Sequence, residues 1–144
     1  MDRENTNNKD LNLFFENFLK TTELVKEREI TPGLTVKLRV LNAGDLLVAE
    51  SIMSHSDSPS DIVVKIRAAS ILSQSLISIN EVEIERKGFT DREIRERRVA
   101  LYGQLLKMPS MIIQKMYELY LEAVQEQNSK YENTSELGED ITNF

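Results

Sequence analysis

Apolar residues near the N-terminus recur at three- and four-residue spacing, the pattern of one face of an α-helix. Asp10 comes just before this stripe and can cap the helix. Residues 1–9 are rich in Asn, Asp and Glu, and we expect them to form a flexible arm. The stripe fits either a helix packed on its own core or an amphipathic arm that binds another subunit. Its members are Leu11, Phe14, Phe15, Phe18 and Leu19.

The hydrophobic period changes from helical to alternating between residues 24 and 41. From Leu34 to Val40 every second residue is apolar, which predicts a strand with one buried face. A weaker alternation precedes it, and the Thr-Pro-Gly-Leu sequence at 31–34 separates the two. Pro favours the second position of a type II turn and Gly the third. The segment therefore predicts a β-hairpin, which must pack on a helix or pair with another sheet to be stable.

Helical periodicity and capping residues predict four further helices. Asn42 opens a helix that runs through Met53, and Ser60 or Asp61 opens a longer one over 61–79. This longer helix carries little charge and is expected to be central, with Ile62, Val63, Ile66, Ala69, Ser70, Leu72, Ser73, Leu76 and Ile77 in the core. Residues 79–89 fit either a short strand or an extended link.

Two helices complete the C-terminal half of the chain. Thr90 and Glu93 match a capping box, which predicts a helix over 90–107 that ends before Pro109. The last helix is expected over 110–129, and residues 130–144 lose apolar periodicity. The predicted core stripe of the last helix contains Ile112, Ile113, Met116, Leu119, Tyr120 and Ala123.

These elements predict an α+β fold that is mostly α, with about five helices packed around one β-hairpin. A chain of 144 residues corresponds to one domain, and it can bury a core without metals or disulfides. We assign the domain to residues 10–129, between the N-terminal arm 1–9 and a C-terminal tail 130–144.

The negative charge is concentrated in that tail. The chain has a net charge of −6, and Glu132, Glu136, Glu139 and Asp140 contribute four negative charges with no Lys or Arg from 131 onward. The tail also contains Ile141 and Phe144, so it combines charge with apolar groups that could bind a partner. The acidic balance argues against nucleic-acid or membrane binding through the overall field.

The predicted helix 90–107 is locally basic. Six Lys and Arg against four Asp and Glu give residues 85–98 a net charge of +2. Arg95, Arg97 and Arg98 could form a surface for phosphate or an acidic partner. Alternatively, the charges pair along the helix as Asp91–Arg95 and Glu93–Arg97. No aromatic residues alternate with the arginines to stack on bases, so nucleic acid is the weaker option.

The residue types needed for catalysis are scarce. The chain has no Cys and a single His, His55, in a polar loop without a nucleophile elbow. Glu81, Glu83 and Glu85 alternate as on one face of a strand, but no second acidic cluster accompanies them. No glycine-rich nucleotide loop and no long apolar run are present. We therefore expect no catalytic, cofactor or metal site, no membrane span, and a protein that is not an enzyme.

The order of the elements resembles a group of small phage proteins. The hairpin is ITPGLTVKLRVLNAGDLL, the core helix ends in IRAASILSQSLISINEVEI, and two helices read RERRVALYGQLLKMPSMIIQKMYELYLEAV. This pattern, over residues 30–127, is similar to the tail assembly chaperone and baseplate-hub assembly proteins of tailed phages.

The resemblance implies a non-enzymatic protein of a phage tail or baseplate, acting through protein–protein contacts as a virion component or an assembly factor. Expected partners are other tail or baseplate proteins, with self-association as a further option, and the expected location is the virion or the host cytoplasm during assembly. The alternative is a small nucleic-acid-binding regulator that uses helix 90–107. Candidate partner-binding residues are Phe14, Phe15, Phe18, Arg95, Arg97, Arg98, Ile141 and Phe144.

Overall fold

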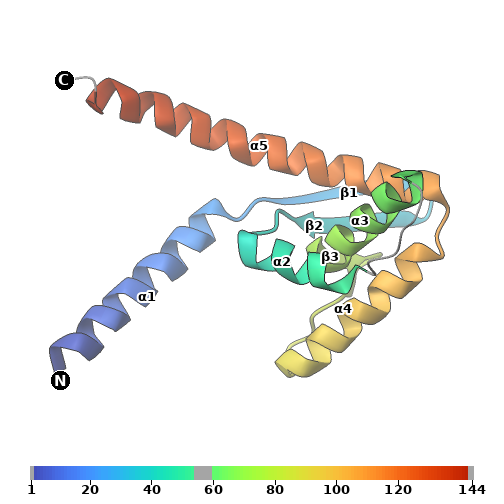
Figure 1. Ribbon diagram of the computed structural model, residues 1–144, viewed down its shortest axis with the longest axis horizontal. Coiled ribbons are helices and arrows are strands. Elements are labelled where there is room, and N and C mark those ends of the chain that lie inside the picture. The colour runs from blue at the N-terminus through green and yellow to red at the C-terminus, as the bar shows by residue number, and fades with distance from the viewer. Residues whose placement is uncertain (1, 54–59, 143–144) are drawn as a thin grey trace.

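The computed structural model describes the backbone of residues 2–53 and 60–142 and the side chains of residues 8–18, 23–53 and 62–132 (Figure 1). The fold is α+β and mostly helical, as predicted, with five helices and a four-stranded antiparallel sheet in this part of the chain. The elements are α1 (Asp2–Thr22), β1 (Val25–Thr31), β2 (Leu34–Arg39), α2 (Ala43–Ile52), α3 (Ser60–Ser75), β3 (Leu76–Ile79), β4 (Val82–Glu83), α4 (Asp91–Leu106) and α5 (Ser110–Thr142).

The sheet contains the predicted hairpin and extends beyond it. Its strand order is β1-β2-β3-β4, so β2 of the hairpin pairs with β3 as well as with β1. Gly33 has a φ of +86°, as expected for the third position of the predicted turn. At Ile30 the pairing of β1 with β2 shifts by one residue, and this side chain is buried although most of β1 is exposed.

The predicted helix 61–79 is wrong at its C-terminal end. The helix α3 stops at Ser75, and Leu76–Ile79 forms β3, where Leu76 pairs with Leu38. A short apolar run does not distinguish a buried strand from a buried helix segment, and pairing with β2 decides between them here. In the ambiguous segment that follows, Val82–Glu83 forms the short strand β4.

The strands β3 and β4 are joined by a two-residue turn at Asn80 and Glu81. Both residues have positive φ, 49° and 67°, and Ile79 pairs with Val82 across them. Two positive φ values define a type I′ turn, whose twist matches that of a hairpin. Asn tolerates this conformation better than Glu does.

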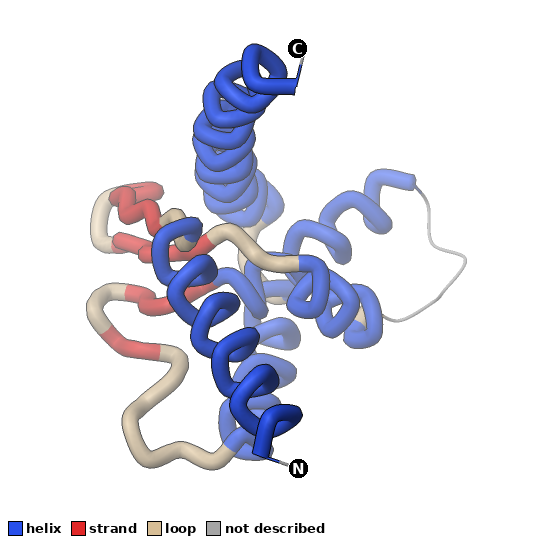
Figure 2. Tube along the Cα trace, turned by 90° about the vertical axis from the view of Figure 1, so that its left-hand side faces the viewer, coloured by secondary structure: helices blue, strands red, loops and turns tan. Residues whose placement is uncertain are grey.

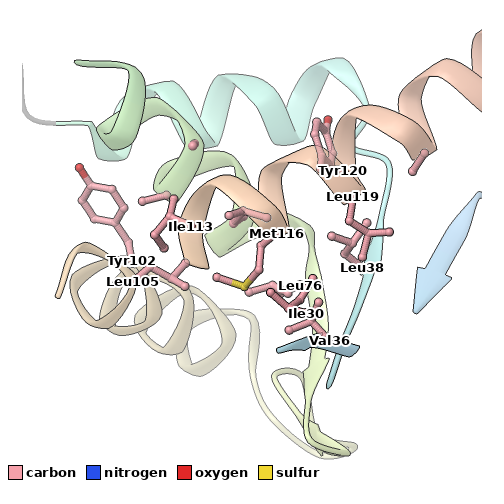
Figure 3. Close-up of a cluster of buried hydrophobic side chains, with 14 of the residues drawn as sticks. Ile30, Val36, Leu38, Leu76, Tyr102, Leu105, Ile113, Met116, Leu119 and Tyr120 are labelled. Carbon is pink, nitrogen blue, oxygen red and sulfur yellow. The ribbon is translucent and has the colours of Figure 1, made fainter. Parts of the chain in front are cut away.

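The core lies between the sheet and the helices. In Figure 2 the strands lie together at the left of the molecule, and the helices occupy the rest of it. Val36 and Leu38 are buried on β2, as predicted. In Figure 3, Leu105 of α4 lies toward Met116 of α5, and Met116 lies against Leu76 and Ile30 of the strands. The buried residues of the α5 stripe are Ile113, Met116, Leu119, Tyr120 and Ala123, and Ile112 is partly buried.

Ile62 and Val63 at the start of α3 do not belong to the core, which corrects a second expectation, whereas Ile66 is partly buried against it as predicted. Ile62 and Val63 are 48% and 40% exposed, whereas Ala69 and Leu72 further along are fully buried. Periodicity identifies the apolar side of a helix, but it does not determine how much of the helix length other elements cover.

The first and last helices are longer than predicted. The helix α1 begins at Asp2, so Asp10 lies inside it, and α5 continues past 129 to Thr142. Most polar residues differ from one another by only a few tenths of a kcal/mol in helix propensity, and neither extension contains Pro. The two internal caps are confirmed: Asn42 Oδ1 accepts from the Asp45 amide at 2.8 Å, and Thr90 Oγ1 from the Glu93 amide at 3.2 Å.

Candidate protein-docking surfaces

The apolar stripe of α1 is exposed. Leu11, Phe14 and Phe15 are 54%, 60% and 51% exposed, and Phe18 is 46% exposed. The Phe14 ring stacks on Phe18 at 6.1 Å between centroids and meets Phe15 edge-on at 5.6 Å. Figure 1 shows α1 projecting away from the rest of the molecule. The structure thus brings the three predicted Phe residues together on one accessible helix face; Leu19 lies outside the described side chains.

The base of α1 is fixed at β1. Between Thr22 and Val25 there are only two residues, Glu23 and Leu24. The Leu24 carbonyl accepts a hydrogen bond from the Val40 amide at 3.1 Å, which extends the β1–β2 pairing by one step. Any change in the direction of α1 must therefore occur close to Glu23.

An apolar groove, which sequence analysis missed, runs between α3 and α5. It encloses a volume of about 630 Å³. The Tyr117 ring forms part of its wall and stacks on the Tyr120 ring, with 6.0 Å between the ring centroids. Lys65 also lines it and donates to the Met108 carbonyl at 3.3 Å. The lining residues are Ile62, Val64, Lys65 and Ala68 of α3 and Ser110, Ile113, Gln114 and Tyr117 of α5.

The sequence contained a signal for this groove. Ile62, Val63 and Val64 are three consecutive apolar residues, and a single helix face cannot bury all three. Val64 is 65% exposed, and the excess of apolar residues at this point marks an accessible apolar surface.

Two of the predicted partner-binding residues of the basic helix α4, Arg97 and Arg98, contact other parts of their own chain. Arg98 is only 5% exposed, and its guanidinium donates to the carbonyls of Ser73 (2.9 Å) and Leu76 (3.1 Å) and to the Glu85 carboxylate (2.8 Å). Arg98 therefore binds the C-terminal end of α3, which corrects its expected place on a binding surface. It satisfies the Ser73 carbonyl, one of those that a helix end leaves without partners, and the Leu76 carbonyl at the start of β3.

Arg97 is partly buried and also contacts its own chain. It donates to the Glu83 carbonyl at 3.1 Å, and its guanidinium carbon lies 5.0 Å from the centre of the Phe89 ring. Arg95 is exposed. Neither predicted pair, Asp91–Arg95 or Glu93–Arg97, forms among the described side chains; the pair along α4 is Arg92–Glu96 at 3.2 Å.

An ion-pair cluster joins β1 to α5. Arg28 donates to both carboxylate oxygens of Glu122, at 3.0 and 2.6 Å, and Lys26 pairs with Glu122 at 3.7 Å and with Glu126. The Arg28 hydrogen bonds hold the pKa of Glu122 below its ordinary value and raise the pKa of Arg28 itself. This cluster fixes β1, and with it the base of α1, along the middle of α5.

The acidic residues near β4 do not form one site. Glu81 lies in the turn, Glu83 in β4, and Glu85 pairs with Arg98. Within the described residues, no group of three or more His, Asp or Glu side chains is placed to hold a metal, and no helix is long and apolar enough to cross a membrane. His55, Ile141 and Phe144 were singled out from the sequence, but their side chains lie outside those that the structure describes.

Comparison with protein-family models, with curated proteins and with solved structures gives no match for this chain.

Proposed function

We propose that this protein is a non-enzymatic assembly protein that binds protein partners through α1. The observation that carries the proposal is the exposure of the α1 stripe, where Phe14 and Phe15 are each more than half accessible. Exposed apolar helix faces of this kind are recurrent docking elements, because a groove on a partner can bury them.

The short connection to β1 supports the same proposal. Ordering a flexible arm on binding costs free energy, and a helix whose base is fixed by Leu24 and the Lys26–Glu126 pair carries less of that cost. The rest of the fold then serves as a rigid body that presents α1 to its partner.

The resemblance of residues 30–127 to tail assembly chaperones and baseplate-hub proteins suggests where such a protein works. On that basis we propose a role in the tail or baseplate of a tailed phage, either as a virion component or as an assembly factor in the host cytoplasm. The partners would then be other tail or baseplate proteins.

Quantitative mass spectrometry of purified particles and of assembly intermediates tests this role. A fixed number of copies per particle supports a virion component, and presence in the intermediates alone supports an assembly factor. Absence from both contradicts the phage role.

Substitution tests the role of α1 in the same experiment. The variant Phe14→Asp/Phe15→Asp should reduce incorporation at least about tenfold, since it places two charges where apolar contact is needed. Leu13→Asp is the matched control, because Leu13 is 56% exposed and lies on the opposite side of α1. Equal incorporation of the Phe variant and the control would contradict docking through α1.

The nucleic-acid alternative loses part of its basis in this structure. Arg98 is buried and Arg97 contacts Glu83 and Phe89, so fewer arginines of α4 are available to phosphate than the sequence predicted. Electrophoretic mobility shifts at low salt, compared between the wild type and Arg92→Ala/Arg95→Ala, test it directly. Binding that this double substitution abolishes would favour the regulator over the assembly protein.

A further inference from the structure

We infer that the partner of α1 is a second copy of this chain. The α1 stripe of each copy binds in the α3–α5 groove of the other copy. This inference rests on the proposed function and names the partner. One chain carries both halves of a helix-in-groove contact: Leu11, Phe14 and Phe15 on α1, and Val64 with Tyr117 in the groove.

The areas favour a reciprocal pair over a single contact. At about 200 Å² for each aromatic side chain, the three half-exposed Phe residues offer roughly 300 Å². The two sides of a protein interface bury similar areas, so one contact would bury roughly 600 Å² and two reciprocal contacts about 1,200 Å², the lower end of stable protein interfaces. A closed two-fold dimer also leaves neither apolar surface open.

The charges of the two surfaces have opposite signs. On α1, Asp10 borders the stripe, four residues before Phe14, and it is negative. Among the residues that line the groove, Lys65 is the charged one, and it is positive. Charges at the rim of an apolar contact contribute little affinity, but they favour this orientation of two partners and disfavour contacts between like surfaces.

The centre of the α1 stripe falls short of the middle of the groove in its own chain. The Lys26–Glu126 pair places the start of β1 opposite residue 126, whereas Gln114 of the groove lies about 18 Å earlier along α5. From the middle of the stripe to Thr22 is about 11 Å of helix, and Glu23 adds about 3.5 Å. Since Leu24 is held by Val40, the middle of the stripe stops short of Gln114 in the same chain even when α1 is laid straight along α5, so the whole stripe cannot lie in its own groove.

Disulfide trapping tests the inference cleanly because the chain has no Cys. A Phe15→Cys chain mixed with a Val64→Cys chain should form a covalent heterodimer on mild oxidation. Leu13→Cys mixed with Val64→Cys is the control on the opposite side of α1. Equal yields from the two mixtures would overturn the inference. So would a Phe15→Cys/Val64→Cys double variant that bridges only within one chain at low protein concentration.

Sedimentation of the uncrosslinked full chain provides an independent measurement. The wild type should form a dimer whose dissociation constant rises at least about tenfold in Phe14→Asp/Phe15→Asp and in Val64→Asp, but not in Leu13→Asp. Circular dichroism checks that each variant folds. A wild type that stays monomeric, or that grows into an open series of oligomers, overturns the reciprocal pair. A monomer that still enters particles contradicts this inference alone, and a dimer absent from particles and their intermediates contradicts only the proposed phage role.

Discussion

Asn80 and Thr35 exchange two hydrogen bonds across the turns at one end of the sheet. The backbone amide of Asn80 donates to the Thr35 carbonyl at 2.8 Å, and the backbone amide of Thr35 donates to Asn80 Oδ1 at 2.8 Å. Asn80 Nδ2 also donates to the Gly33 carbonyl at 2.9 Å. One side chain thereby extends the pairing of β2 with β3 and binds the β1–β2 turn to the β3–β4 turn.

Replacing Asn80 by Ala should destabilise the fold by about 1–2 kcal/mol, because both side-chain hydrogen bonds are lost and Ala disfavours positive φ. Asn80→Asp keeps an acceptor for the Thr35 amide but loses the donor to Gly33, and it should cost less. Urea denaturation of the two variants measures both free energies of unfolding. If Asn80→Ala is as stable as the wild type, the turns are not coupled in this way.

Replacing Glu81 by Gly should stabilise the fold by about 0.5–1 kcal/mol. The φ of +67° at this position is unfavourable for Glu and is freely adopted by Gly, and Asn-Gly is the preferred pair for a type I′ turn. Glu83→Gly, two residues later in β4, is the control and should destabilise instead. Thermal unfolding of the two variants gives shifts of opposite sign if the turn is of this type.

Removing the Arg98 guanidinium should cost about 3 kcal/mol, since two carbonyls and the Glu85 carboxylate lose their shared donor in a buried position. Arg98→Met tests this with a side chain of similar length. Arg95→Met on the exposed side of α4 should change stability by less than about 0.5 kcal/mol. Comparable effects of the two substitutions in chemical denaturation would show that Arg98 is not a structural residue.

The ion pair between Arg28 and Glu122 should make stability depend on pH and salt. The pKa of Glu122 is lower in the folded chain than its ordinary value of 4.5. Its contribution is therefore fully present above that ordinary value and is lost as the pH falls through the folded pKa. The wild type should exceed Glu122→Gln in stability at pH 7, and the difference should shrink below pH 4.5 and in high salt.

Both charges of that pair are exposed, so the effect should be smaller than that of Arg98→Met. Glu27→Gln is the control, because Glu27 lies next to Arg28 on β1. Unfolding measured between pH 3 and 7 for the three proteins checks the sign. A difference that grows on acidification would contradict the assignment.

Local chemistry was sufficient to predict the hairpin, the two internal helix caps and the buried stripe of α5. In each of these, the deciding residues are neighbours in sequence: Gly33 supplies the positive φ, and Asn42 and Thr90 accept from amides three residues ahead. The strand β3 was missed because its identity depends on pairing with β2 and on Arg98, which lies 22 residues after Leu76.

The candidate docking surfaces were predictable only in part. The α1 stripe follows from spacing alone. The run of apolar residues at 62–64 indicates excess apolar surface on α3, but the bounds of the groove depend on where α5 stops covering α3. The burial of Arg98 had a local signal, since it stands four residues from both Ile94 and Tyr102 on the apolar line of α4. A run of basic residues therefore predicts more exposed positive charge than the fold has, when one of those residues lies on the apolar face of its helix.

The length of α5 has a mechanical consequence. Ala123 is the last of its buried residues among the described side chains, and residues 124–142 continue the helix for roughly 28 Å. In a straight helix, each residue adds about 1.5 Å of length and rotates the end of the helix by about 100° about its axis. Deleting two residues between 124 and 130 would shorten α5 by only about 3 Å but would rotate the residues after the deletion by about 200° about the helix axis. The end of α5 is thus set in angle far more strictly than in distance.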